Sequence, residues 1–81
     1  MLKIYGSMLC PDCGKCREDL DRAQVAYEYL DFGKSVKYLK EFLVIRDGNA
    51  VFDEARANGS IGIPCIVKED GTVTLSWNEF L

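Results

Sequence analysis

Hydrophobic and polar residues alternate along two segments near the N-terminus of the chain. Residues 2–5 and residues 27–32 both show this alternation and are rich in strand-forming side chains. A period of two is typical of a β-strand that buries one face. Two further strands are expected toward the C-terminus, at residues 63–68 and about 72–75, joined as a β-hairpin by a turn at residues 69–71.

A longer period, close to that of an α-helix, runs from Pro11 to about Gln24. Proline suits the first position of a helix, because its missing N–H would have no intrahelical partner there. Cys10 is then expected to be the N-cap residue or its neighbour. The apolar face of this helix is expected to carry Cys13, Cys16, Leu20 and Ala23.

Two more helices are expected in the middle of the chain. Ser35 can cap a helix over about residues 36–46, and Asn49 can cap a shorter helix that stops at Gly59. Their inward-facing residues are expected to be Val36, Leu39, Phe42 and Leu43 in the first helix, and Val51, Phe52 and Ala55 in the second.

The order of these elements predicts an α/β protein. A parallel strand–helix–strand unit is followed by one or two helices and an antiparallel hairpin, which gives a mixed four-stranded sheet covered by helices. Residues 77–81 are expected to form only a short tail. The chain has 81 residues, and domains usually contain about 100–150, so residues 1–81 are expected to form a single domain.

Composition and charge exclude several classes of function. A hydrophobic fraction of 48% can fill a core, and the net charge of −3 argues against binding to nucleic acid or an anionic membrane. The sequence contains no transmembrane run and no recognisable signal peptide, so we expect a cytoplasmic protein, and we expect it to be a monomer. Histidine is absent, which excludes a Cys–His pair and histidine-containing zinc sites.

The cysteines are the most informative residues. Cys10, Cys13 and Cys16 lie within seven residues, and Cys65 is the fourth. In a reducing cytoplasm, cysteines are more often catalytic or metal-binding than joined in structural disulfides. A thiolate is the nucleophile in disulfide exchange, and the N-terminus of a helix favours an anion. Cys10 at the helix start and Cys13 one turn deeper therefore suit an exposed attacking thiol and a sheltered resolving thiol.

Other interpretations of the cysteines remain open at this point. Cys13 and Cys16 lie on the apolar face, where free cysteines often act as small buried hydrophobes. Cys16 and Cys65 could instead be auxiliary redox thiols. All four cysteines could hold zinc or an iron–sulfur cluster, which would make the protein a metal carrier. A redox-inert adaptor that keeps the fold as a binding surface is a third possibility.

Two residues between the first cysteines affect the same site. Pro11 fixes the start of the helix, so that the two sulfur atoms keep a definite separation. Asp12 in the first turn favours the helix, but its negative charge disfavours a neighbouring thiolate. Asp12 could therefore moderate reactivity or repel anionic substrates, or simply place a favourable charge at the helix start.

The chain resembles the glutaredoxin family of the thioredoxin superfamily. The resemblance rests on the strand at residues 2–5 followed by Cys10-Pro11-Asp12-Cys13, on Gly62-Ile63-Pro64 followed by Cys65-Ile66-Val67, and on the hairpin at residues 69–71. It implies a thioredoxin-like fold and a cytoplasmic thiol–disulfide oxidoreductase that serves electron transport and redox homeostasis. Cys10 would be the attacking thiolate, Cys13 the resolving cysteine, and Pro64 a cis proline against the disulfide.

The resemblance also indicates substrates and partners. Pro11, Asp12, Ile63 and Pro64 are expected at substrate-binding positions, where the backbone of Ile63 could pair with an extended substrate. The substrates would be disulfide-containing proteins or glutathione mixed disulfides, and no bound cofactor is expected. The Cys10–Cys13 disulfide would be reduced by glutathione or by a thioredoxin-reductase-like donor. The residues after the hairpin, Ser76-Trp77-Asn78-Glu79, stand where glutaredoxins carry a glycine pair that helps to bind glutathione.

Overall fold

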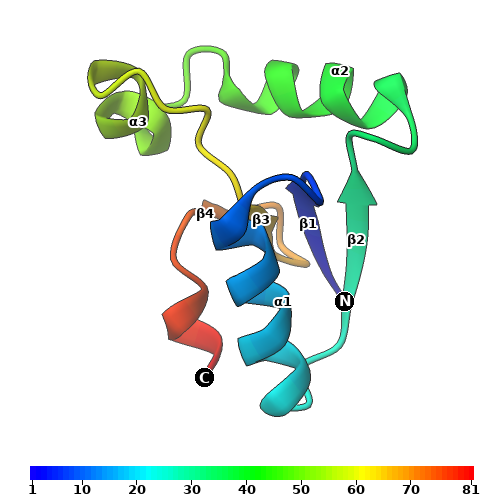
Figure 1. The fold of residues 1–81 in the computed structure, drawn as a ribbon. Helices are drawn as coiled ribbons and strands as arrows, with labels where there is room; N and C mark the ends of the chain where they lie inside the picture. Colours follow the sequence, from blue (N-terminus) through cyan, green and yellow to red (C-terminus); the bar gives the residue numbers. More distant parts are fainter.

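Four strands form one mixed sheet in the computed structural model, which describes all residues from 1 to 81 (Figure 1). The strands are β1 (Leu2–Gly6), β2 (Tyr27–Asp31), β3 (Cys65–Val67) and β4 (Val73–Thr74), in the spatial order β2-β1-β3-β4. β1 is parallel to β2 and antiparallel to β3, and β3 is antiparallel to β4. The predicted mixed four-stranded α/β sheet is therefore confirmed.

The strands of the hairpin are shorter than expected. β3 begins only at Cys65, because Pro64 has no N–H to donate to a neighbouring strand. Gly62, which precedes it by two residues, has a left-handed backbone with φ 92°, so the chain is not yet extended there. The peptide bond between Ile63 and Pro64 is cis, as the resemblance to glutaredoxins predicted.

Three helices and two short 3-10 helices complete the fold. They are α1 (Pro11–Arg22), α2 (Val36–Arg46), η1 (Ala50–Phe52), α3 (Asp53–Ala57) and η2 (Trp77–Phe80). Ser35 and Asn49 cap α2 and η1 as predicted, through side chains that accept from the N–H groups of Lys37 and Val51. None of the helices is both long and apolar enough to cross a lipid bilayer.

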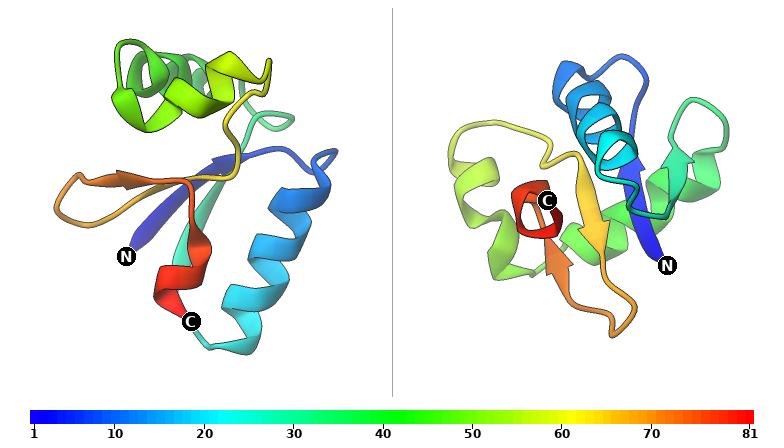
Figure 2. Two further views of the ribbon diagram at one scale, coloured as in Figure 1. Left: turned by 90° about the vertical axis from the view of Figure 1, so that its left-hand side faces the viewer. Right: turned by 90° about the horizontal axis from the view of Figure 1, so that it is seen from below.

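The helices lie on both faces of the sheet (Figure 2). α1 and η2 lie on one side, whereas α2 and α3 lie on the other. Alternation along β1 sends Ile4 into the core under α1 and Tyr5 into the core under α2. The hydrophobic residues are thus divided between two cores by the sheet.

Four apolar residues expected in the core are exposed instead. Val36, Leu43 and Val51 are 64%, 49% and 42% exposed, and Ala23 is exposed because α1 ends at Arg22. The buried face of α2 is set by Phe42, whose ring lies 5.3 Å from that of Phe32 and 5.8 Å from that of Phe52. Residues three or four positions from Phe42 share its face, and Val36 and Leu43 do not.

The residues that pack on this face of α2 are Tyr38, Leu39, Phe42 and Ile45. In the next segment, residues 50–52 form a 3-10 helix that buries only Phe52, so its neighbour Val51 points to solvent. Gly59 ends the helical segment as predicted, with φ 71°.

Candidate functional site

Cys10 caps the N-terminus of α1 with its own sulfur. Its backbone is extended (φ −93°, ψ 117°), and its Sγ accepts a hydrogen bond of 3.3 Å from the backbone N–H of Cys13. This is the position that a serine or threonine oxygen usually takes in an N-cap. Because Pro11 begins the helix, the half-buried sulfur lies at the positive end of the helix dipole.

Cys13 lies one turn deeper and is fully buried. Burial, and then a hydrogen bond with the Cys10 thiol, raise the pKa of Cys13 to about 12. All four cysteines are free thiols in this structure. The predicted pair of a more accessible Cys10 and a sheltered Cys13 is therefore present at the start of α1.

The thiol of Cys13 is enclosed by Gly6 and Tyr29. A Cβ atom on Gly6 would lie 2.8 Å from Cys13 Sγ and 2.7 Å from the Tyr29 hydroxyl oxygen. Both atoms therefore occupy the space in front of Gly6, the last residue of β1. The Tyr29 hydroxyl is buried and has no hydrogen-bond partner, and the guanidinium of Arg17 lies 4.4 Å from the centre of its ring.

Gly6 and Tyr29 were not among the residues expected at this site. Alternation in residues 27–32 places Tyr27 and Tyr29 on one face of β2, and a glycine at a strand end often marks a close approach. What the pattern does not contain is the packing of α1 across β1 and β2, which brings Cys13 to these two residues.

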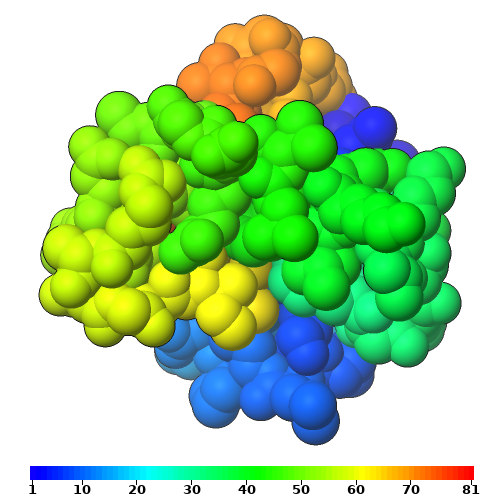
Figure 3. All heavy atoms as spheres, turned by 90° about the horizontal axis from the view of Figure 1, so that it is seen from above, coloured from blue at the N-terminus to red at the C-terminus, as the bar shows by residue number.

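An open groove of about 560 Å³ runs beside Cys10. It is lined by residues from the loop before α1 and the loop after α3, namely Ser7, Leu9, Cys10, Gly59, Ser60, Ile61, Gly62 and Ile63. Figure 3 shows the loop after α3, in yellow, against the blue segment that leads into α1. No charged side chain lines this groove, and Leu9 and Ile61 are 93% and 58% exposed.

The four expected substrate-binding residues occupy different places. Ile63 lines the groove, and Pro64 is buried behind it. Pro11 and Asp12 are exposed on the first turn of α1, next to Cys10 but outside the groove. The structure thus brings Cys10 and Ile63 to one surface.

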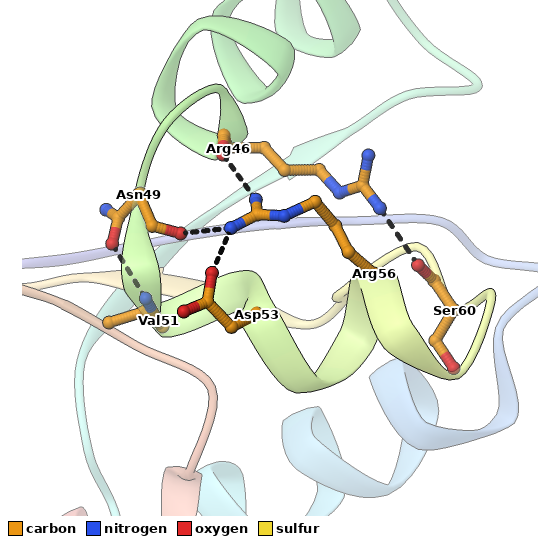
Figure 4. A network of polar contacts seen from close by, with 6 residues as sticks. All are labelled: Arg46, Asn49, Val51, Asp53, Arg56 and Ser60. Carbon is orange, nitrogen blue, oxygen red and sulfur yellow. Dashed lines mark hydrogen bonds and ion pairs between the residues drawn. The ribbon is translucent and has the colours of Figure 1, made fainter.

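Two arginines contact or support the loop after α3, residues 59–63, which forms one wall of the groove (Figure 4). Arg46, the last residue of α2, donates a hydrogen bond of 3.0 Å to the backbone carbonyl of Ser60 in the groove wall. Arg56 of α3 donates to the carbonyls of Arg46 and Asn49 at 3.1 and 3.0 Å, and forms an ion pair with Asp53. The end of α2, the segment that follows it, α3 and the groove wall are thereby joined.

Cys16 and Cys65 lie on opposite faces of the sheet. Cys16 is buried with Ile4, Leu20 and Ile66 under α1, whereas Cys65 belongs to the core under α2. Burial, and then the charge of Asp19, raise the pKa of Cys16 to about 11. Burial raises the pKa of Cys65 to about 12. Both proposed auxiliary thiols are 0% exposed.

The four cysteines do not meet at one point. No group of three or more Cys, Asp or Glu side chains is arranged to hold a metal ion. The alternative site made of Cys10, Cys13, Cys16 and Cys65 would require the sheet to open between the last two of these residues.

The mixed sheet and the paired thiols at the start of α1 define a small α/β protein with a Cys-x-x-Cys site. The chain is similar to an uncharacterized protein from Haemophilus influenzae, with 39% identity over 76 residues that cover 94% of this chain and 88% of the relative. It belongs to the family of that protein. No family model and no solved structure matches the chain.

Proposed function

We propose that this protein is a thiol–disulfide oxidoreductase that reduces disulfides with Cys10 and Cys13. One observation carries the proposal: a half-buried sulfur caps α1 beside an uncharged groove, and a fully buried thiol lies one turn deeper. A dithiol mechanism needs one thiol that the substrate can reach and a second thiol that the substrate cannot reach.

The reaction proceeds in two exchanges. The Cys10 thiolate attacks one sulfur of the substrate disulfide, forms a mixed disulfide, and releases the other sulfur, which takes a proton from water. The Cys13 thiol then loses its proton and attacks Cys10 Sγ, and the second substrate sulfur leaves and is protonated. The substrate gains two electrons and two protons, and glutathione or a thioredoxin-reductase-like donor later returns them to the Cys10–Cys13 disulfide.

The contacts of Cys13 favour a mechanism in which Cys10 reacts first and Cys13 second. The hydrogen bond with Cys10 and the Cys10 charge both help to raise the pKa of the Cys13 thiol in the reduced protein. Both effects are lost once Cys10 is held in a mixed disulfide, because that sulfur then carries no charge and is a poor acceptor for the Cys13 S–H. The pKa of Cys13 is therefore expected to fall at the step in which Cys13 must attack.

The groove favours a disulfide in a protein segment as the substrate. Glutathione has two carboxylates, and no lysine or arginine lines the groove to pair with them. The exposed side chains of Leu9 and Ile61 can instead cover apolar residues beside a substrate cysteine. An extended segment at Ile63 could also pair with the backbone there.

The same observations support a thioredoxin-like fold and the resemblance to glutaredoxins. The parallel β1–β2 pair joined by α1 and the antiparallel hairpin of β3 and β4 are features that the resemblance implies. After β4 the chain forms η2, a 3-10 helix of four residues.

The proposal is tested with single cysteine variants and a protein disulfide substrate. Cys10→Ser is expected to abolish disulfide reduction, and Cys13→Ser is expected to accumulate a mixed disulfide on Cys10, detected by mass spectrometry. Cys16→Ala is the matched control on the same helix and is expected to retain activity. Full reduction by Cys10→Ser would show that the proposed function is wrong.

A further inference from the structure

The hydroxyl group of Tyr29 is the one buried tyrosine oxygen without a hydrogen-bond partner. Burying a hydroxyl without a partner is unfavourable, so such a group calls for an explanation. The Cys13 sulfur is a candidate partner, because the Tyr29 hydroxyl oxygen and this sulfur both lie within 2.8 Å of the Cβ position of Gly6. In the reduced protein Cys13 is a neutral thiol, which is a weak acceptor.

We propose that Tyr29 donates a hydrogen bond to the thiolate of Cys13 when Cys13 resolves the mixed disulfide. This role rests on the dithiol mechanism proposed above and adds a residue to it. A buried thiolate has lost its hydration and is costly without a donor. The Tyr29 hydroxyl lies beside the sulfur, and no other group accepts its hydrogen.

The step leaves Tyr29 itself unchanged. The Cys13 proton passes to solvent, the Cys13 electron pair forms the bond to Cys10 Sγ, and the substrate sulfur leaves with the electrons of the broken bond. The tyrosine keeps its proton throughout, because burial and then the charge of Cys13 raise the pKa of Tyr29 above its usual value. Its hydroxyl therefore remains a donor when the thiolate forms.

Charged and titratable groups surround the pair formed by Cys13 and Tyr29. Cys10 lies beside Cys13 on the substrate side. The Arg17 guanidinium covers the Tyr29 ring from α1 and, taken alone, lowers the pKa of Tyr29, but burial and the charge of Cys13 outweigh it. The carboxylate of Asp31, at the end of β2, accepts the N–H of Gly33 at 2.8 Å, and its charge also raises the pKa of Tyr29.

Tyr29→Phe removes only the hydroxyl, and Tyr27→Phe is the matched control. Tyr27 lies on the same face of β2 and also contacts Arg17, but its hydroxyl donates to Asp21 at 2.7 Å on the surface. Wild type and both variants are mixed with a protein disulfide in a single turnover, quenched with acid, and analysed by mass spectrometry. The signal is the amount of mixed disulfide on Cys10 against time.

In Tyr29→Phe, formation of the mixed disulfide is expected at the wild-type rate, and its resolution is expected to slow about ten- to a hundredfold. The pH midpoint of the resolution rate should move upward, which a merely looser fold would not cause. Tyr27→Phe should resolve at the wild-type rate and midpoint. Resolution by Tyr29→Phe at the wild-type rate, with an unmoved midpoint, would overturn the proposal.

A second variant keeps the proposal testable if Tyr29→Phe does not fold. A 3-fluorotyrosine placed at position 29 keeps the ring and the hydroxyl, and fluorine makes the hydroxyl a stronger donor. The midpoint of resolution should then move downward, and an unmoved midpoint would contradict the role of Tyr29. If the wild-type protein reduces none of the substrate disulfide and Cys13→Ser accumulates no mixed disulfide on Cys10, the proposed function fails. If wild type resolves normally and neither variant changes the rate or midpoint, only the role of Tyr29 fails.

Discussion

The thiol of Cys13 occupies the space that a side chain on Gly6 would need. A Cβ on Gly6 would come within 2.8 Å of Cys13 Sγ, closer than real contacts of this kind. The end of β1 can therefore approach the first turn of α1 only because residue 6 is a glycine. This close approach places the Cys13 thiol one turn below Cys10 and next to Tyr29.

Gly6→Ala is expected to lower the free energy of unfolding by about 1–3 kcal/mol, the usual cost of overpacking a core. It should also slow closure of the Cys10–Cys13 disulfide, because the Cys13 thiol must move. Gly14→Ala is the control on the neighbouring helix, where a Cβ would meet nothing within 4 Å. That change should stabilise α1 by about 0.5–1 kcal/mol. Urea unfolding measures both, and equal stability of the two variants would contradict the prediction.

Gly62→Ala is expected to disturb the groove wall. Gly62 has φ 92°, and a Cβ there would lie 2.6 Å from the Phe52 ring, so the variant combines a strained backbone with a clash in the core. Gly71→Ala is the matched control, because Gly71 has φ 88° and nothing lies within 4 Å of its Cβ position. Thermal unfolding should show that Gly62→Ala loses about 1–3 kcal/mol more than Gly71→Ala. A loss no larger than that of the control would show that Phe52 can move aside.

Local sequence patterns were sufficient to predict the part of the site at the N-terminus of α1. Proline at position 11 predicted the beginning of α1 and the capping role of Cys10, because both follow from the geometry of one helical turn. Alternation of polar and apolar residues predicted the strands, and the order of elements predicted the mixed sheet. The cis bond before Pro64 was expected from resemblance and is present.

Contacts between distant residues were not contained in those patterns. The buried face of α2 depends on where Phe42 meets Phe32 and Phe52, which no spacing within α2 specifies. The separation of Cys16 from Cys65 follows from the register that pairs Cys65 with Tyr5 across β1. A shift of that register by one residue would have placed Cys65 on the face of α1 instead.

Arg46 is expected to affect substrate binding through the groove wall. Arg46→Met removes the hydrogen bond to the Ser60 carbonyl and keeps the backbone carbonyl that Arg56 contacts. With the wall less fixed, KM for a protein disulfide should rise several-fold, while alkylation of Cys10 by a small reagent should keep its rate. Arg22→Met, at an exposed position of α1, is the control and should change neither quantity. An unchanged KM in Arg46→Met would show that the loop holds its shape without this contact.

The buried thiol of Cys65 should make the protein less stable in alkali. Burial raises the pKa of Cys65 in the folded protein to about 12, from an ordinary value of 9.0. Because the folded-state pKa is the higher one, the stabilisation is complete below pH 9 and is lost as the pH rises from 9 toward 12. In this range each such thiol lowers the free energy of unfolding by up to about 1.4 kcal/mol per pH unit.

Cys65→Val tests this dependence, because valine fills a similar volume and cannot ionise. Urea unfolding under reducing conditions, at about pH 8 and about pH 10, should show a smaller loss of stability in the variant than in wild type. Cys16, whose pKa is raised to about 11, remains in both proteins, so some alkaline loss should persist in the variant. The same loss in both proteins would mean that the Cys65 thiol ionises as easily in the folded chain as in the unfolded one. Such a result would contradict the complete burial of the Cys65 side chain between the sheet and α2.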